Sequence, residues 1–360
     1  MFFYVVKNKH IVFEIEKIVQ YSYEQNDGLG VDKMINYIKN GNKSVYPVIY
    51  PINNSLKSIN CYLYKHNNTL TMIDAGINTE DFKHYFEQQL KQFDFKLSDI
   101  DQIVLTHHHS DHIGLVNWIT EQYNIPVYAH SLSIPRLHLT DDYQLQKIAF
   151  FTELYKHFGC LELAATRMEK MKATYENSHL HRINCEITPL YDCNRIGDLQ
   201  VLETPGHSLD SVALYDADTN WLFAGDLLLS HGTSNALIDH DSVGQLLPTV
   251  TQFLSSLKKC QALDINYVFS GHQSIFSDIE KVIENNISKI DYKFNRLIGK
   301  IEEGNSTITQ LAFSIYGNRV QKEETLILSD IIGYISYAES LGKIKCIQGK
   351  QGIFFTRVNK

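Results

Sequence analysis

Residues 106–112 read Thr-His-His-His-Ser-Asp-His, and this segment constrains the chain more than any other feature. Four potential metal ligands fall within it: His107, His109, Asp111 and His112. Imidazole nitrogens and carboxylate oxygens are ligands that first-row divalent cations accept. One short loop with four such side chains can serve two ions at once. The spacing therefore predicts a metal centre, whereas an isolated histidine triplet would favour a solvated loop.

The His-rich loop follows residues 100–105, an apolar run that is typical of a buried strand. In α/β sheets, ligands usually bind at the carboxyl ends of the strands. Three later segments repeat this order, with an apolar strand, small residues including glycine, and then a donor. Glycine lets the backbone turn tightly and approach an ion. The repeats are residues 199–203 before His207, 221–224 before Asp226 and 267–270 before His272, and residues 70–76 add Asp74 at another strand end.

Taken together and in this order, the motifs resemble the metallo-β-lactamase superfamily over about residues 45–285. The family pattern is a strand-end Asp, His-x-His-x-Asp-His, a later His, a bridging Asp and a final His. The resemblance implies a first ion with the ligands His107, His109 and His207. It implies a second ion with the ligands Asp111, His112 and His272. Asp226 would bridge the two ions, and Asp74 would orient ligands rather than bind metal.

The donor set also indicates a reaction. Two divalent ions about 3.5–4 Å apart can share a water, lower its pKa, and hold the hydroxide in line with a polarised carbonyl or phosphoryl group. Asp111 and Asp226 are the candidate catalytic residues, because they would flank that hydroxide and orient it or accept its proton. All the donors are nitrogen or oxygen atoms, which suits Zn²⁺ and also admits Mn²⁺ or Fe²⁺. We expect two zinc ions.

Differences from the patterns of related families reduce the number of reactions that this chain is expected to catalyse. Zinc β-lactamases carry Cys or Ser where this chain has Asp226, and flavodiiron proteins carry Glu where it has His109. Glyoxalase II has the same dinuclear ligand set, although its glutathione-binding C-terminal helices are not evident here. We therefore predict a hydrolase in which a hydroxide bridging two ions attacks an ester or thioester of a small molecule. Two alternatives stay open: a phosphodiesterase or endoribonuclease acting on single-stranded RNA, and a non-catalytic binding or regulatory protein.

Two segments with apolar residues at helical spacing precede His207. They are residues 141–157 and 161–175, with Gly159 as a stop between them. We expect a helical cap over the metal cleft at about residues 131–190.

A polar loop that contains glycine follows Asp226 and would lie over the same cleft. Its side chains are candidates for contact with the substrate or for protonation of the leaving group, and a solvated loop is the alternative. The candidates are His231, Ser234 and Asn235.

From about residue 288 the pattern changes to three helices and a hairpin. The expected segments are helix 296–303, helix 307–316 capped by Ser306, helix 323–340, and strands 344–347 and 353–357. This order resembles the winged-helix domain found in a subset of the superfamily, one branch of which cuts single-stranded RNA.

Charge argues against sequence-specific DNA binding by this region. Residues 288–360 hold 11 Lys and Arg against 7 Asp and Glu, although the whole chain has a net charge of −8. The expected recognition helix, 323–340, has no Lys or Arg, which does not suit a DNA major groove. Lys343, Lys345 and Lys350 would still reach a phosphate backbone, so RNA stays a candidate partner. A dimer contact or a wall of the active site is the alternative role.

Length and composition agree with a soluble enzyme. The 360 residues are 44% apolar, enough to bury a large core, and no apolar run approaches the ~20 residues that cross a membrane. The apolar start is too short for a signal peptide, and the six cysteines lack paired spacing. We therefore expect a cytoplasmic protein that acts on a small-molecule substrate without a membrane, with homo-oligomerisation left open.

The expected architecture is an α/β, four-layer αββα metallo-β-lactamase sandwich with a small C-terminal winged-helix domain. Residues 45–287 would form the catalytic domain and residues 288–360 the winged helix. Residues 1–44 would be an N-terminal extension of unknown role. Its expected elements are a hairpin of residues 2–6 and 11–15 and a short helix at 31–39.

Overall fold

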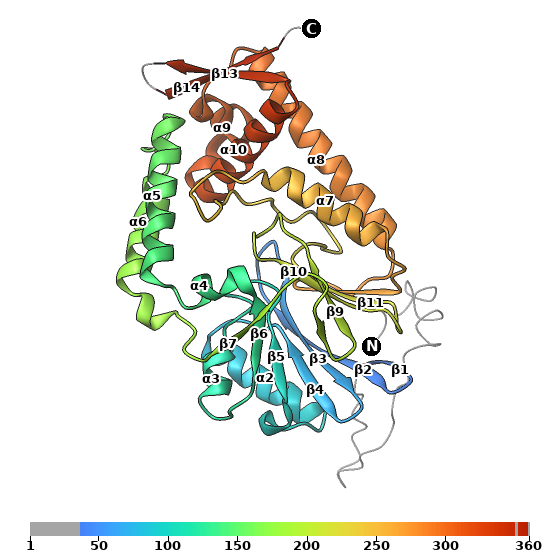
Figure 1. Cartoon of the computed structure of the whole chain (residues 1–360). Coiled ribbons are helices and arrows are strands. Elements are labelled where there is room, and N and C mark those ends of the chain that lie inside the picture. Colours follow the sequence, from blue (N-terminus) through green and yellow to red (C-terminus); the bar gives the residue numbers. More distant parts are fainter. Residues whose placement is uncertain (1–36, 350–351, 359–360) are drawn as a thin grey trace, which may run out of the picture.

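The computed structural model describes residues 37–349 and 352–358 as two β-sheets packed face to face, with helices outside them (Figure 1). The first sheet has seven strands in sequential order. They are β1 (Ile38–Asn40), β2 (Lys43–Pro51), β3 (Ser58–His66), β4 (Thr69–Ile73), β5 (Gln102–Val104), β6 (Val127–His130) and β7 (Ile187–Leu190). Strands β1 to β4 pair antiparallel, and β4 to β7 pair parallel.

The second sheet has five strands in the order β12-β11-β10-β9-β8. They are β8 (Arg195–Ile196), β9 (Leu199–Glu203), β10 (Val212–Asp216), β11 (Trp221–Gly225) and β12 (Tyr267–Ser270). Only β11 and β12 pair parallel among these strands. Because parallel neighbours end at the same edge, the loops after β4 and β5 lie together in one sheet, and those after β11 and β12 lie together in the other.

Alternation along the strands divides the apolar side chains between different cores. Tyr62 and Tyr64 of β3 pack between the sheets, whereas Cys61 and Leu63 face the helices outside the first sheet. These outer helices are α2 (Glu80–Gln92) and α3 (Val116–Thr120). Strands β10 and β11 alternate in the same way between the inter-sheet core and the core outside the second sheet. The predicted αββα sandwich is therefore confirmed.

Helices from two regions cover the outer side of the second sheet. The central region contributes α5 (Asp141–His157) and α6 (Ala165–Glu176), whereas the preceding α4 (Ile134–Leu137) packs on the outer core of the first sheet. The later region contributes α7 (Thr249–Gln261), α8 (Ile279–Glu302), α9 (Ile308–Tyr316), α10 (Glu324–Ser340) and a hairpin of β13 (Ile344–Gly349) and β14 (Gly352–Arg357). Buried residues of α5 to α10 and the hairpin belong to one hydrophobic cluster with the second sheet. In Figure 1, α5 and α6 extend from the sandwich toward this hairpin.

Several element boundaries differ from the sequence predictions. Helix α8 runs through residue 288, where we expected a domain boundary. Helix α9 is capped by Thr307, not Ser306, because the Thr307 side chain accepts from the Gln310 N–H while Gln310 reaches back. Helix α6 starts at Ala165 after a turn, later than predicted. Short 3-10 helices are η1 (Leu97–Asp99), η2 (Ser131–Ser133), η3 (Ser178–Leu180) and η4 (Gly317–Gln321).

Only a small part of the predicted N-terminal elements lies within the described residues. The hairpin of residues 2–6 and 11–15 lies outside the described residues, as does most of the helix at 31–39. That helix is wrong at its end, because Ile38–Asn40 is the edge strand β1. The first sheet thus starts before residue 45. No helix in the described ranges is long and apolar enough to cross a membrane.

A buried ion cluster joins the two sheets at the end opposite the His-rich loop. The ammonium group of Lys43, on β2, lies 2.8 Å from Asp216 Oδ1, 2.9 Å from Asp218 Oδ2 and 2.9 Å from Asp198 Oδ2. The Tyr64 hydroxyl donates to Asp216 Oδ2 over 2.8 Å. Lys43 is 3% exposed and Asp216 is fully buried, so each charge depends on the other for compensation.

Candidate metal centre

The loops after β4, β5, β9, β11 and β12 converge and bring the predicted ligands together. Their donor atoms form three groups, within each of which the atoms lie no more than 4.8 Å apart. The groups are His107, His109 and His207; His107, His112 and Asp226; and Asp111, His112 and His272. Every side chain predicted to bind metal therefore belongs to at least one group, and the assignment of individual ions stays a prediction.

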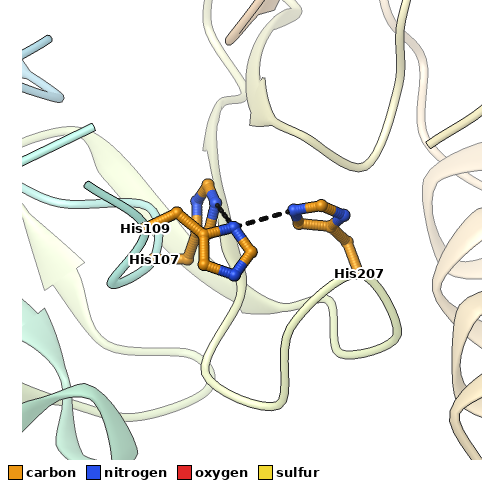
Figure 2. A group of neighbouring side chains, drawn as sticks. All are labelled: His107, His109 and His207. Atoms are coloured by element: carbon orange, nitrogen blue, oxygen red, sulfur yellow. Dashed lines mark hydrogen bonds between the residues drawn. The ribbon is translucent and has the colours of Figure 1, made fainter. Parts of the chain in front are cut away.

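Figure 2 shows the first group, in which two rings from the His-rich loop face the ring of His207. His109 Nδ1 lies 3.0 Å from His107 Nε2 and 3.0 Å from His207 Nε2. Ligand atoms bound at ~2.1 Å to one tetrahedral ion stand ~3.4 Å apart. The three nitrogens are thus spaced closely enough to share a cation.

Asp226 lies between the first group and the remaining donors. Its Oδ1 is 3.2 Å from His112 Nε2, and its Oδ2 is 3.2 Å from His272 Nε2 and 3.4 Å from His207 Nε2. Asp111 Oδ2 is 3.6 Å from His272 Nε2 on the other side. Each of the three rings thus has one oxygen of Asp226 nearby. A bridging ligand requires this position.

Hydrogen bonds behind the rings orient them. His272 Nδ1 donates to the Ser58 carbonyl over 2.7 Å, and His207 Nδ1 donates to the Asn235 carbonyl over 3.1 Å. His112 Nδ1 lies 2.8 Å from Asp74 Oδ2. A ring that donates through Nδ1 carries its lone pair on Nε2, which is the atom turned into the centre. The protein therefore fixes both the orientation and the tautomer that metal binding needs.

The donor atoms fit divalent cations by a second criterion. Within the described ranges, His112 Nε2, His272 Nε2 and Asp226 Oδ1 are buried without a hydrogen-bond partner. Each such atom costs about 1–3 kcal/mol unless another partner compensates for lost hydration. Three of them facing one another would all be satisfied by cations. Their nitrogen and oxygen chemistry suits Zn²⁺ and admits Mn²⁺ or Fe²⁺.

The electrostatics of the centre agree with this fit. Burial lowers the pKa of His107 and His109 well below the usual range, so these rings are neutral, the form that binds metal. Burial also opposes charge on His112, yet Asp226 and Asp74 together raise its pKa well above the usual range. Conversely, although burial opposes ionisation, His112 and His272 hold the pKa of Asp226 well below its ordinary value. The carboxylates of Asp226 and Asp74 thus favour positive charge at His112, as they would favour a bound cation beside it.

Asp74, predicted to orient ligands, contacts the His-rich loop through both carboxylate oxygens. Its Oδ1 accepts from the Thr106 N–H over 2.8 Å, and its Oδ2 accepts from the Thr106 hydroxyl over 2.9 Å. Because Oδ2 also contacts His112, one carboxylate positions both the start and the end of the His-rich loop. Asp74 has a φ of 56°, an uncommon value outside glycine, which the surrounding hydrogen bonds hold in place.

We predict that Asp74→Asn weakens zinc binding by about 10–100-fold. The amide nitrogen would replace one carboxylate oxygen and would oppose its N–H to another donor, either the Thr106 backbone N–H or His112 Nδ1–H, so the loop would lose its orientation. Competition with a chromogenic chelator measures the affinity. Asp291→Asn, on the exposed face of α8, is the matched control. Equal zinc affinity in the two variants would contradict the positioning role of Asp74.

Gly271 allows the second sheet to approach the centre closely. A Cβ at this position would lie 2.4 Å from Asp226 Oδ1 and 2.7 Å from His112 Cε1. The backbone cannot withdraw freely, because the Gly271 N–H donates to the Gly225 carbonyl and the Gly271 carbonyl accepts from Asn60 N–H. Gly271 thus provides space for ligand atoms, whereas a Cβ at Gly225 would meet Thr106 and a Cβ at Gly206 would meet Phe253.

The sequence did not identify Asp210, which anchors the His-rich loop from the second sheet. Its carboxylate accepts from the His108 backbone N–H over 3.0 Å and lies 2.9 Å from His108 Nδ1. The Ser133 hydroxyl also donates to it over 2.6 Å. His108 belongs to none of the ligand groups. Its nearness to Asp210 depends on tertiary packing, and no local motif marks that pair.

An open cleft of about 450 Å³ lies beside the donors. The loop after β11 lines it with His231, Ser234 and Asn235, the predicted substrate contacts. The structure gives two of them an additional role, because the Ser234 hydroxyl lies 2.7 Å from His207 Nδ1 and the Asn235 carbonyl contacts the same nitrogen. Leu326 of α10 forms part of the wall. The later helices therefore contribute directly to the cleft.

Comparison with known sequences extends these observations. A model of the metallo-beta-lactamase superfamily matches residues 55–272. The probable metallo-hydrolase YqjP of Bacillus subtilis (strain 168) is 27% identical over 272 residues, which cover 75% of this chain and 84% of that protein. A hydroxyacylglutathione hydrolase of Bdellovibrio bacteriovorus is 22% identical over 245 residues, with 68% and 72% covered. The exodeoxyribonuclease YycJ of Bacillus anthracis is 26% identical over 129 residues, with 35% and 47% covered.

Solved structures show the same fold at low sequence identity. A metallo-beta-lactamase family protein from Thermus thermophilus superposes with a TM-score of 0.69 at 21% identity, covering 87% of this chain and 98% of that chain. A beta-lactamase domain protein from Burkholderia ambifaria superposes with a TM-score of 0.67 at 16% identity, covering 94% and 99%. Both comparisons include the helices that follow the second sheet, because their coverage extends well beyond the matched residues 55–272.

Proposed function

Because this chain belongs to the metallo-beta-lactamase superfamily, we propose that it is a dinuclear metal-dependent hydrolase that cleaves an ester or thioester of a small molecule. The observation that carries the proposal is the position of Asp226 between two groups of histidine donors. A thiolate or hydroxyl at that position would leave the two groups without a shared carboxylate. The two relatives named as hydrolases, YqjP and the Bdellovibrio protein, support the same reaction class.

The residues of the centre have distinct roles in this proposal. Two divalent ions bound here would activate water and polarise the bond to be broken. Asp226 and Asp111 would hold the attacking water and accept its proton, because each has a carboxylate oxygen within 3.6 Å of His272 Nε2. Asp74 keeps His112 in the binding tautomer. The resident metal is proposed to be zinc, with manganese or iron as the alternatives to be measured.

The cleft supports a small substrate. Its volume of about 450 Å³ lies in the usual range of small-molecule sites, ~300–1,000 Å³. Apolar side chains such as Leu229, Leu237 and Leu326 line it together with the polar loop after β11. A fungal relative from Aspergillus fumigatus, 24% identical over 86 residues, is named an acyl-carrier-protein thioesterase. That name supports the thioester branch of the proposal.

Cleavage of RNA phosphodiesters is the second candidate. Lys343 and Lys345 are exposed near the β13–β14 hairpin, and Lys350 lies outside the described residues. The relative named as an exodeoxyribonuclease acts, by its name, on a nucleic acid. If RNA is the substrate, its binding weakens steeply with ionic strength and with Lys345→Ala, since phosphate contacts release counterions.

A panel of thioester, lactone and phosphodiester reporters tests the proposal on the full chain loaded with zinc, manganese or iron. We expect turnover of a thioester or ester, together with about two ions per chain by elemental analysis. Phosphodiester turnover alone would replace the proposal by the second candidate. Two bound ions without turnover of any reporter would favour a non-catalytic binding protein.

A further inference from the structure

A second, narrower pocket adjoins the first histidine group. It has a volume of about 80 Å³, and by the same measure one water occupies about 10–15 Å³. His109 and His207 line both this pocket and the open cleft, so the two cavities meet at these histidines. We call it the basic pocket, after its lining residues Arg136, Lys147 and Arg167.

The basic pocket carries uncompensated positive charge. Arg136 is neutralised by Asp239, the only carboxylate among the described lining residues, at 2.8 Å. Within the described ranges, neither Lys147 nor Arg167 forms an ion pair with a carboxylate. This local excess contrasts with the net charge of −8 on the whole chain. A concave site with two free cations favours an anion.

Arg167 is held ready for such a contact. Its guanidinium carbon stacks 4.0 Å from the centroid of Phe151, and one of its nitrogens donates to the Tyr155 hydroxyl over 2.7 Å. An arginine has five N–H donors, so several are left for an oxyanion. Lys147 lies over the ring of Tyr143, 5.5 Å from its centroid, without a hydrogen bond in the described chain. A stacked arginine loses little entropy when it binds an oxyanion.

We propose that the basic pocket binds an anionic oxygen group of the substrate, a carboxylate or a phosphate, close to the bond that is cleaved. This inference rests on the proposed function for its catalytic part, since it names the chemical class of the substrate of that site. The anionic group lies against Arg167 and Lys147, the reacting bond lies at the histidines shared by both cavities, and the rest of the molecule lies in the open cleft. The helical cap thereby selects the substrate, because α5 supplies Lys147 and α6 supplies Arg167.

Titration calorimetry with inorganic phosphate and with acetate tests the pocket on the metal-loaded full chain. We expect Arg167→Met and Lys147→Met each to raise the phosphate or acetate dissociation constant by about tenfold or more, because each removes a charged hydrogen bond. Whichever anion responds identifies the group bound. Lys172→Met, an exposed position on α6, is the control and stays within about twofold of the parent. Methionine keeps the contact with Phe151, and a thermal melt verifies folding.

A pair of thioester reporters that differ only in a carboxylate beside the acyl group supplies the second measurement. We expect the parent to prefer the charged reporter in kcat/KM, and Arg167→Met to lower this preference by about tenfold, with partial recovery in Arg167→Lys. Anion affinities that are equal in the parent and both variants would overturn the basic pocket, even if thioesters are cleaved. If the two variants lose anion affinity but the parent cleaves no thioester, the basic pocket is retained and the proposed function is rejected.

Discussion

Asp226→Ala is expected to lower kcat for the cleaved reporter by on the order of a thousandfold, which corresponds to several kcal/mol of lost transition-state stabilisation. The reason is its position between His112, His207 and His272, each within 3.4 Å of one of its oxygens. No neighbouring carboxylate can take its place, because Asp111 approaches only the His272 side and, at 4.0 Å, His112. The variant should also bind fewer metal ions per chain.

Steady-state kinetics and elemental analysis on the same preparation measure both effects. Asp291→Ala makes the same change at an exposed position and should leave both values unchanged. A variant that keeps two ions and most of its activity would refute a bridging and catalytic role for Asp226. If Asp226→Ala loses activity but keeps its full metal content, Asp226 is needed for catalysis and not for metal binding.

Lys43→Met is expected to lower the free energy of unfolding by about 3–5 kcal/mol, because it leaves a buried carboxylate without its partner. Asp216 is fully buried and would keep only the hydrogen bonds from Tyr64 and the Asp218 N–H. The methylene groups of Lys43 are replaced by a side chain of similar length, so packing changes little. Urea denaturation measures the loss.

Two further variants identify the cause of that loss. Lys39→Met removes a lysine at an exposed position of the same sheet and should change stability by no more than about 0.5 kcal/mol. Lys43→Met combined with Asp216→Asn removes both charges and should recover much of the stability, because no ion is left buried alone. If Asp216→Asn lowers the free energy of unfolding of the Lys43→Met variant further instead of raising it, the two charges act independently and the argument fails.

The sequence predicted those parts of the fold that depend on local patterns. Helix α5 has the predicted bounds because Thr140 caps it and Gly159 stops it, and strands β9 and β12 have the predicted bounds because each is a short, mainly apolar segment followed closely by glycine. Errors occurred where two local solutions compete, as at Ser306 and Thr307, which are adjacent and can both cap a helix. Thr307 prevails because its side chain accepts from the Gln310 backbone N–H and completes a capping box, whereas Ser306 only donates to the Gln310 side chain.

The candidate ligands were also visible in the sequence, since three follow a strand and a glycine and four stand in the His-x-His-x-Asp-His motif. Apart from Asp74, their supporting residues were not. Asp210 contacts His108 across 102 positions, and Arg167 reaches the pocket only because α6 packs on α5. No repeat or spacing marks such residues, because their roles arise from the docking of segments that are distant along the chain. Sequence patterns therefore predict which side chains are candidate ligands, whereas tertiary packing decides how these side chains are oriented and what surrounds them.

The single hydrophobic cluster that joins the second sheet to α5 through α10 has a consequence for cooperativity. A chain cut at residue 287 would divide α8 and expose the apolar residues of α7 that pack on α10. The C-terminal helices therefore cannot be removed or exchanged as a module, and we expect the second sheet to melt with them in one transition. A change in the shape of this cleft during evolution would then require compensating changes both in the second sheet and in the helices that share its core.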